Sequence, residues 1–197
     1  MVYLIRHTTP NVPKGTCYGQ SDIDVTPTFD TEAKAIQAAL PTHTAIHVYT
    51  STLQRCTKLA HYLYGTATAT PLLMEINCGS WEMQHWDSIP TQVLDPWMQD
   101  YVHTPMPNGE SYVQFYNRIV AVYDSIILKH SPNPIAIVAH GGVLRSILSY
   151  ITRTPLEHSF EAFKIHYGCV VQVNEHDNSY SYLHNVAHAA EQHKPSI

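Results

Sequence analysis

The sequence lacks several features that would each have indicated a particular class of protein. No apolar run approaches the roughly 18 residues that cross a membrane, and no basic segment followed by a long apolar one indicates a secretory signal. Charged residues make up only 14% of the 197 residues, and 11 Lys and Arg against 16 Asp and Glu give a net charge of −5. A nucleic-acid-binding surface would be strongly basic. We therefore expect a cytoplasmic protein with neither a membrane nor a nucleic-acid partner.

Cysteine is scarce, and its positions exclude the chemistry that clustered cysteines perform. No Cys-x-x-Cys pair suited to zinc or redox work is present. No cysteine is followed six residues later by arginine, as the anion-binding loop of a cysteine phosphatase would require. We expect four reduced thiols, as is usual in the cytosol: Cys17, Cys56, Cys78 and Cys169.

Histidine, by contrast, is abundant, with 14 residues. His184 and His188 have helical spacing and His193 follows, which could suggest a metal site. No acidic or cysteine partner stands at ligand spacing beside them. We therefore expect a polar C-terminal tail at about 185–197, and a protein that uses no metal and no cofactor.

Short apolar runs alternate with amphipathic segments, which predicts an α/β protein. Residues 2–5 and 134–139 are typical of buried strands, 45–49 of a second strand along the chain, 71–76 of a third strand or extended segment, and 110–130 of a long helix. We expect a three-layer α/β/α sandwich with a mostly parallel central sheet, built as a single domain over residues 1–197. The aromatic, proline-rich stretch at about 78–108 has weak periodicity and is expected to be a lid-like insertion.

Polar residues follow the predicted strands at the points where they end. Arg6 and His7 come after the first strand, Arg55 shortly after the second, Glu75 at the end of the third and His140 directly after the central one. In open α/β sheets, ligands bind beyond the carboxyl ends of the strands. Arginine forks match phosphate oxygens, so this combination predicts an anion site with an acid–base partner.

The same residues suit metal-free phosphoryl transfer. A neutral His7 imidazole is a competent nucleophile if its other ring nitrogen is held by a backbone carbonyl. Arg6, Arg55 and protonated His140 would neutralise the oxygens of the transferred phosphoryl group. Glu75 could protonate the leaving alkoxide and later accept a proton from water.

Four motifs in this order resemble the histidine phosphatase superfamily, which has the phosphoglycerate mutase-like fold, over about residues 2–150. They are Leu4-Ile5-Arg6-His7-Thr8, the segment from Thr50 to Cys56, Glu75 ahead of Gly79-Ser80-Trp81-Glu82, and Val138-Ala139-His140-Gly141-Gly142. The resemblance implies that His7 is the phosphorylated nucleophile, that Glu75 is the proton donor, and that Arg6, Arg55 and His140 form the phosphate pocket. It also implies a structural role for Glu82.

Within the superfamily, the chain is most similar to the alpha-ribazole phosphatases. The similarity lies in Arg-His-Thr in place of Arg-His-Gly, in Cys17-Tyr18-Gly19-Gln20, and in Trp81-Glu82-Met83 with the following Trp86–Pro90 segment. Those enzymes dephosphorylate alpha-ribazole 5′-phosphate in cobalamin nucleotide-loop assembly. Many members of the superfamily place an asparagine in the phosphate pocket six residues after the nucleophile, where this chain has Pro13. We expect Asn11 or Gln20 to fill that role.

Other interpretations stay open. The chain could be a broad-specificity sugar-phosphate phosphatase, a phosphoglycerate mutase, or a non-catalytic module that binds phosphoesters. Pure binding needs the arginines but not Glu75 or two histidines, which disfavours the last. Trp81, Trp86 and Trp97 could either stack on a heteroaromatic substrate or simply pack together.

Overall fold

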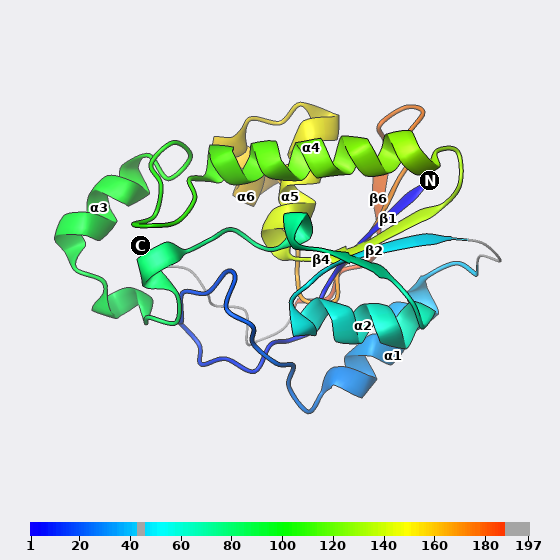
Figure 1. The fold of residues 1–197 in the computed structure, drawn as a ribbon, viewed down its shortest axis with the longest axis horizontal. Coiled ribbons are helices and arrows are strands. Elements are labelled where there is room, and N and C mark those ends of the chain that lie inside the picture. The colour runs from blue at the N-terminus through cyan, green and yellow to red at the C-terminus, as the bar shows by residue number, and fades with distance from the viewer. Residues whose placement is uncertain (43–45, 188–197) are drawn as a thin grey trace.

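A central β-sheet organises the molecule in the computed structural model, which describes residues 1–42 and 46–187. Within these ranges, one six-stranded sheet has the order β3-β2-β4-β1-β5-β6 (Figure 1). Its strands are β1 (Val2–Arg6), β2 (His47–Ser51), β3 (Thr68–Thr70), β4 (Ile135–Ala139), β5 (Val170–Val173) and β6 (Tyr180–His184). The strands β3, β2, β4 and β1 run parallel, and β5 pairs antiparallel with both β1 and β6. The predicted α/β fold with a mostly parallel sheet is confirmed.

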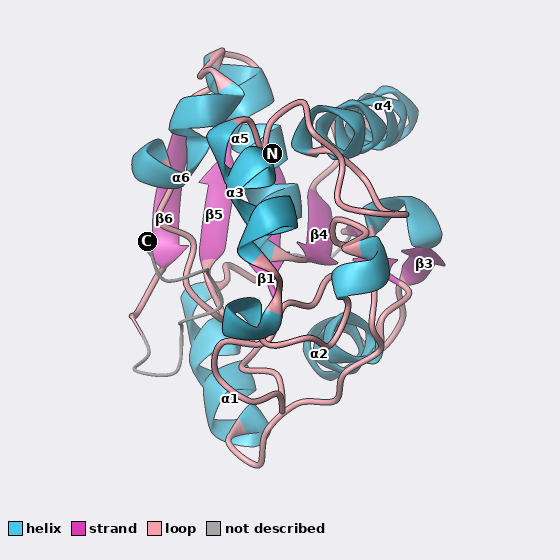
Figure 2. Cartoon of the chain, turned by 90° about the vertical axis from the view of Figure 1, so that its left-hand side faces the viewer, coloured by secondary structure: helices cyan, strands magenta, loops and turns pink. Residues whose placement is uncertain are grey.

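Helices cover both faces of the sheet, as Figure 2 shows. The helices α1 (Phe29–Ala39) and α2 (Gln54–Tyr64) lie on one face, and α4 (Tyr112–His130), α5 (Gly141–Thr152) and the short α6 (Ser159–Ala162) lie on the other. All five residues of β4 are buried. Because successive strand side chains point to opposite faces, Ala136 and Val138 pack in the core under α1 and α2, while Ile135 and Ile137 pack in the core under α4 and α5.

The long helix α4 has clear signals at both ends. The Ser111 hydroxyl accepts a hydrogen bond from the Gln114 amide, and the Gln114 side chain accepts one from the Ser111 amide, which makes a capping box. Lys129 and His130 occupy the last turn, where cations are favoured by the helix dipole. The predicted helix is therefore confirmed, with its start two residues later than expected.

The third strand differs from the expectation. It is Thr68–Thr70, and the segment Pro71–Leu73 forms a 3₁₀ helix instead of continuing the strand. Pro71 has no amide to donate to a sheet ladder, and the Thr70 side chain accepts a hydrogen bond from the Leu72 amide. Of the two predictions for 71–76, a strand is therefore wrong, and an extended segment is wrong for Pro71–Leu73, while the backbone is extended at Met74.

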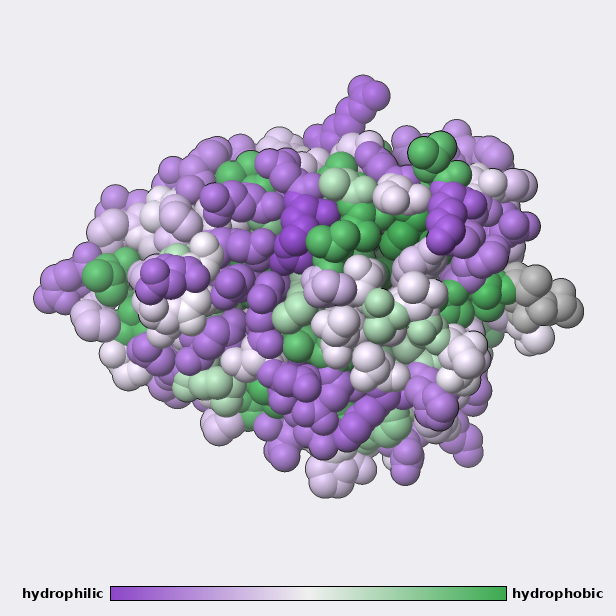
Figure 3. All heavy atoms as spheres, viewed as in Figure 1, coloured by the Kyte–Doolittle hydropathy of each residue, from purple (hydrophilic) through white to green (hydrophobic). Residues whose placement is uncertain are grey.

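The segment 78–108 lies at one end of the molecule, on the left in Figure 1. It contains two 3₁₀ turns, Gly79–Trp81 and Trp86–Ser88, and the helix α3 (Thr91–Gln99). Its core is a separate cluster of buried side chains. The face of the molecule seen in Figure 3 is largely hydrophilic, and hydrophobic side chains gather between α4 and β2. Among the described residues, no helix combines the length and the apolar character needed to cross a membrane.

Candidate active site

The pairing of β1 with β4 brings His7 and His140 together. Arg6 lies opposite Ala139 in the register, and the His7 amide donates to the Ala139 carbonyl at 3.0 Å. The two imidazole rings meet edge to face with centroids 5.2 Å apart. Both side chains are buried at the carboxyl end of the parallel strands. Two histidines separated by more than 130 residues in the sequence thus share one site.

The His7 ring is oriented by its own backbone. Its Nδ1 lies 2.7 Å from the Thr8 carbonyl oxygen. A carbonyl oxygen can only accept, so Nδ1 carries the proton in this hydrogen bond and Nε2 of the neutral ring keeps its lone pair. This is the tautomer that a nucleophile attacking through Nε2 requires.

His140 is buried beside Ser51 and Cys56. Its Nε2 lies 2.8 Å from the Ser51 hydroxyl, and the Cys56 sulfur lies 3.5 Å from the same nitrogen. Burial, helped by the positive charges of Arg55 and Arg6, holds the pKa of His140 well below its ordinary value. Burial also raises the pKa of Cys56 to about 12, so this sulfur stays a thiol. His140 is therefore neutral when no anion occupies the site.

Anion binding is expected to be coupled to proton uptake at His140. A dianion beside the ring favours the charged imidazolium, so the pKa of His140 rises on binding and the ring takes up a proton near pH 7. Sulfate is a suitable probe because it exchanges no proton of its own in this range. Calorimetric titration with sulfate in two buffers of different ionisation enthalpy measures the uptake. In the His140→Gln variant the uptake should disappear, and uptake that persists there would contradict the assignment.

Two arginines flank the histidines. Arg6 donates from Nη1 to the Ile165 carbonyl at 2.7 Å, and its guanidinium carbon lies 3.9 Å from the centre of the Tyr167 ring. Arg55 is fully buried and donates to the carbonyls of Ser21 at 2.8 Å and Gly19 at 2.6 Å. Its Nε is also buried and has no hydrogen-bond partner within the described ranges. Arg55 thus keeps a donor for an anion while its other nitrogens are held in place.

Glu75 contacts the start of α5. Its carboxylate accepts from the Gly142 amide at 2.9 Å and from the Ile76 amide at 3.0 Å. A Cβ on residue 142 would lie 2.3 Å from Glu75 Oε1, so only glycine allows this approach. The carboxyl group is therefore held at Gly142, two residues after His140 in the sequence.

The structure separates the two candidates for the remaining phosphate contact. The Gln20 side chain donates to the Glu75 carbonyl at 3.1 Å, which places it beside the predicted acid. Asn11 is exposed, and its backbone amide bonds to the Asp24 carbonyl at 2.7 Å. Of the two, Gln20 therefore lies beside Glu75 and Asn11 lies at the surface.

An ion pair that sequence analysis missed holds the segment that carries Glu75. Arg118 makes two parallel bonds to Glu110, at 2.9 Å from Nε and 2.8 Å from Nη2. The same guanidinium donates to the Leu72 and Met74 carbonyls, at 2.9 Å and 3.0 Å. Glu110 stands in the Asn-Gly-Glu-Ser turn before α4, but nothing in the spacing of Arg118 indicated this partner.

Glu82 plays the structural role that the family resemblance implies. Its carboxylate accepts from the amides of Gly19, Gln20 and Ser21 at 3.1, 2.8 and 3.2 Å, and from the Ser21 hydroxyl at 2.5 Å. Burial raises the pKa of Glu82, but the Ser21 hydroxyl and the backbone amides outweigh it, so the pKa is lower than usual. Glu82 thereby fixes the loop whose carbonyls orient Arg55.

Replacing Glu82 by glutamine is expected to lower the free energy of unfolding by about 2 kcal/mol at pH 7, because an amide nitrogen would face these donors. A carboxylate with a lowered pKa stabilises the fold above its ordinary value of 4.5, and this contribution is lost as the pH falls through the lowered pKa. Urea unfolding of both proteins should therefore show a difference that shrinks at acid pH. Asp87→Asn, an exposed change in the same segment, is the control, and an equal loss there would refute this role of Glu82.

The three tryptophans pack against one another. The Trp81 ring centroid lies 6.1 Å from that of Trp86 and 5.3 Å from that of Trp97, both edge to face, and Trp86 stacks on Trp97 at 5.9 Å. Trp81 and Trp86 are buried. Of the two roles considered from the sequence, the structure supports packing.

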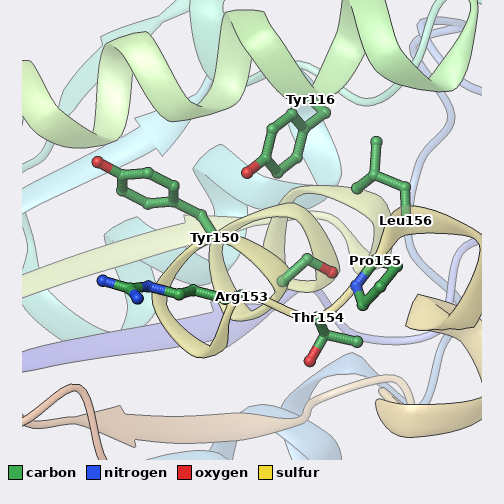
Figure 4. A pocket seen from close by; sticks show the side chains of 7 residues that line it. Tyr116, Tyr150, Arg153, Thr154, Pro155 and Leu156 are labelled. Carbon is green, nitrogen blue, oxygen red and sulfur yellow. The ribbon is translucent and has the colours of Figure 1, made fainter.

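A cavity of about 410 Å³ lies between α4 and the far end of α5, away from His140 at the other end of that helix (Figure 4). It shares no residue with the predicted site. It is lined by Tyr116, Ser149, Tyr150, Arg153, Thr154, Pro155 and Leu156.

Within residues 1–42 and 46–187, no group of three or more His, Cys, Asp or Glu side chains is arranged to hold a metal ion. His184 belongs to β6. His188 and His193, and with them most of the predicted polar tail, lie outside the described residues.

Comparison with known proteins agrees with the motifs. A family model described as "Histidine phosphatase superfamily (branch 1)" matches residues 2–186. The "Putative phosphoserine phosphatase 2" of Hydrogenobacter thermophilus is 26% identical over 196 residues, which cover 95% of this chain and 96% of that protein. The "Probable phosphoglycerate mutase GpmB" of Proteus mirabilis is 27% identical over 164 residues, 78% of this chain and 75% of that one.

Among solved structures, the alpha-ribazole phosphatase from Shigella flexneri superposes with a TM-score of 0.79 at 23% identity, and the alignment covers 92% of this chain and 93% of that one. A putative alpha-ribazole-5′-P phosphatase from Escherichia coli gives a TM-score of 0.80 at 22% identity over 96% of both chains. These likenesses establish the phosphoglycerate mutase-like fold. Together with the family match over nearly the whole sequence, they show that this chain belongs to the histidine phosphatase superfamily, branch 1.

Proposed function

We propose that this chain is a cytoplasmic phosphomonoesterase that works through a phosphohistidine at His7 and needs no metal or cofactor. The observation that carries the proposal is the oriented His7 ring: Nδ1 is held by the Thr8 carbonyl at 2.7 Å, and the ring centroid lies 5.2 Å from that of His140. A backbone carbonyl that fixes the tautomer prepares the opposite nitrogen for attack.

The proposed reaction has two steps on the same residues. His7 Nε2 forms a bond to phosphorus as the ester P–O bond breaks, and Glu75 gives its proton to the leaving alkoxide. Water then attacks the phosphohistidine while Glu75 takes the water proton, which releases phosphate and restores neutral His7. Throughout, Arg6, Arg55 and protonated His140 offset the charge on the phosphoryl oxygens.

We propose alpha-ribazole 5′-phosphate, an intermediate of cobalamin biosynthesis, as the substrate. The support is the similarity of the Cys17–Gln20 and Trp81–Met83 segments to alpha-ribazole phosphatases, and the fold likeness to two proteins of that name. The alternative with the same chemistry is a broad-specificity sugar-phosphate phosphatase, for which 78–108 would be a less selective lid. Two further alternatives are a phosphoglycerate mutase and a non-catalytic phosphoester-binding module, neither of which would give net release of phosphate.

The test is phosphate release from a panel of esters in the presence of a chelator. The panel contains alpha-ribazole 5′-phosphate, O-phosphoserine, 3-phosphoglycerate and several sugar phosphates. We expect the highest kcat/KM with alpha-ribazole 5′-phosphate. Comparable values for all sugar phosphates would support the broad-specificity enzyme, and phosphate transfer between hydroxyls without release would indicate a mutase. Binding of esters with no turnover of any of them would overturn the catalytic proposal.

A further inference from the structure

Two tyrosines connect the two arginines of the proposed phosphate site. Tyr167 is fully buried, and its ring lies under the Arg6 guanidinium at 3.9 Å. Tyr18 is half-buried, and its ring centre lies 5.5 Å from the Arg55 guanidinium carbon. The two hydroxyl oxygens are 2.9 Å apart, which is a hydrogen bond. A chain of contacts therefore runs from one arginine to the other through two rings.

Tyr167 is itself anchored to the nucleophile. The Arg6 amide donates to the Cys169 carbonyl at 2.9 Å, and the Gly168 amide donates to the His7 carbonyl at 3.0 Å. Gly168 has a φ of 69°, a conformation that glycine adopts without strain, and this turn sets Tyr167 against β1. The centroids of the Tyr167 and His7 rings lie 5.7 Å apart. The backbone thus fixes one end of the tyrosine pair beside both Arg6 and His7.

Tyr18 belongs to a different part of the chain. It precedes Gly19, whose carbonyl accepts from Arg55 at 2.6 Å and whose amide is held by Glu82. Burial raises the pKa of Tyr18, so its hydroxyl keeps its proton near neutral pH and one tyrosine can donate to the other. The hydroxyl pair therefore joins the loop that holds Arg55 to the turn that holds Arg6.

Two guanidinium groups in one pocket repel each other, and each would turn away from an empty site if its side chain were unrestrained. A cation over an aromatic ring is stabilised by the ring face, and the ring also restricts where the cation can lie. A hydrogen bond between the two rings then fixes the separation of the two cations. A phosphate group with fixed oxygen geometry gains most from donors that are already in place.

We propose that Tyr18 and Tyr167 are positioning residues that act as a bridge, setting the distance between Arg6 and Arg55 for a phosphoryl group. The proposal rests on the proposed function, because it takes these arginines as the phosphate ligands. The bridge touches neither the ester oxygen nor the leaving group. It acts on phosphate through the arginines.

The test measures inorganic phosphate binding by calorimetry in Tyr18→Phe, Tyr167→Phe and the double variant. Each phenylalanine keeps the ring and removes one hydroxyl of the same hydrogen bond. We expect each single change to raise the Kd of phosphate about three- to tenfold, the range of one ordinary hydrogen bond. Either change alone already breaks the hydrogen bond. The phosphate Kd of the double variant should therefore be no larger than the larger of the two single-variant values.

Tyr112→Phe is the matched control. Tyr112 is also buried, and its hydroxyl bonds to the Ser159 hydroxyl at 3.1 Å, away from both arginines. We expect its Tm to fall by about as much as that of Tyr167→Phe while its phosphate Kd stays within about twofold of wild type. A phosphate Kd that follows Tm equally in all these variants would mean that the tyrosines only stabilise the fold, and would overturn the proposal.

Two further outcomes separate this inference from the proposed function. If the fold increase in phosphate Kd of the double variant equals the product of the two single-variant increases, the hydroxyls act independently and the bridge is refuted. If the wild type binds phosphate but hydrolyses no ester, the catalytic proposal fails while the Kd comparison still decides the bridge. Tyr18→Leu, at a position outside the fully buried core, removes a ring, and a Kd no larger than that of Tyr18→Phe would refute the contribution of the ring to holding Arg55.

Discussion

Replacing His7 by alanine is expected to lower kcat for phosphomonoester hydrolysis by about four orders of magnitude or more, because alanine cannot form the covalent intermediate. Phosphate binding should persist, since Arg6 and Arg55 keep their own partners. The same variant should fail to retain phosphate after brief mixing with a labelled ester and quenching in base. Wild type should retain acid-labile, base-stable label, as a phosphohistidine does.

His61→Ala is the control for this experiment. His61 is an exposed histidine on α2 whose Nδ1 contacts the Gly65 carbonyl at 2.7 Å, and its loss should leave kcat unchanged. Label on His7→Ala equal to that on wild type would refute His7 as the nucleophile. Unchanged release of phosphate by His7→Ala would refute it independently.

Replacing Glu75 by glutamine should lower kcat for an alkyl phosphate by about two to three orders of magnitude, the range contributed by a positioned general acid. The side-chain oxygen of glutamine can still accept from the Gly142 amide, while its nitrogen would replace the oxygen that accepts from the Ile76 amide. The amide, however, has no proton to give to a leaving alkoxide.

The leaving group makes this prediction specific. p-Nitrophenolate needs no protonation to depart, so Glu75→Gln should slow formation of the phosphohistidine from p-nitrophenyl phosphate far less than from an alkyl ester. Pre-steady-state release of p-nitrophenol measures that step. Glu157→Gln, an exposed change beside α6, is the control. Equal losses for both esters in the first step would contradict the role of Glu75 as the acid.

The part of this site that could be predicted from the sequence consists of residues that directly follow a strand. Residues placed by contacts with distant segments could not be predicted in the same way. Arg6, His7 and His140 stand directly after β1 and β4, so apolar runs and their ends were enough to bring them to one edge of the sheet. Glu75 contacts the Gly142 amide, two residues after His140, although its own segment is not a strand. Its position depends on the Gly142 amide and on Arg118, contacts between segments more than 40 residues apart.

The choice between Gln20 and Asn11 shows the same limit. Both lie in a long loop without periodicity, where the chain path follows from contacts with distant residues. Glu82 accepts from the Gln20 amide at 2.8 Å, and this contact turns Gln20 toward the acid. The role of the tryptophans was equally undecidable, because stacking on a ligand and packing on each other require the same residue type.

The pairing of β1 with β4 has a consequence for how the protein acquires activity during synthesis. Val2–Arg6 is made long before its parallel neighbour Ile135–Ala139, and β5 at Val170–Val173, which closes its other side, is made later still. A nascent chain that stops short of Ile135 holds His7 but neither of the strands that flank β1. Bringing β1 and β4 together is slow compared with the formation of α1 or α2. The chain loses conformational entropy on closing this long loop before any contact between the two strands compensates for it. Activity should therefore appear only after β4 and β5 have been made, and a ribosome-released fragment ending before β4 should be inert even where its helices have formed.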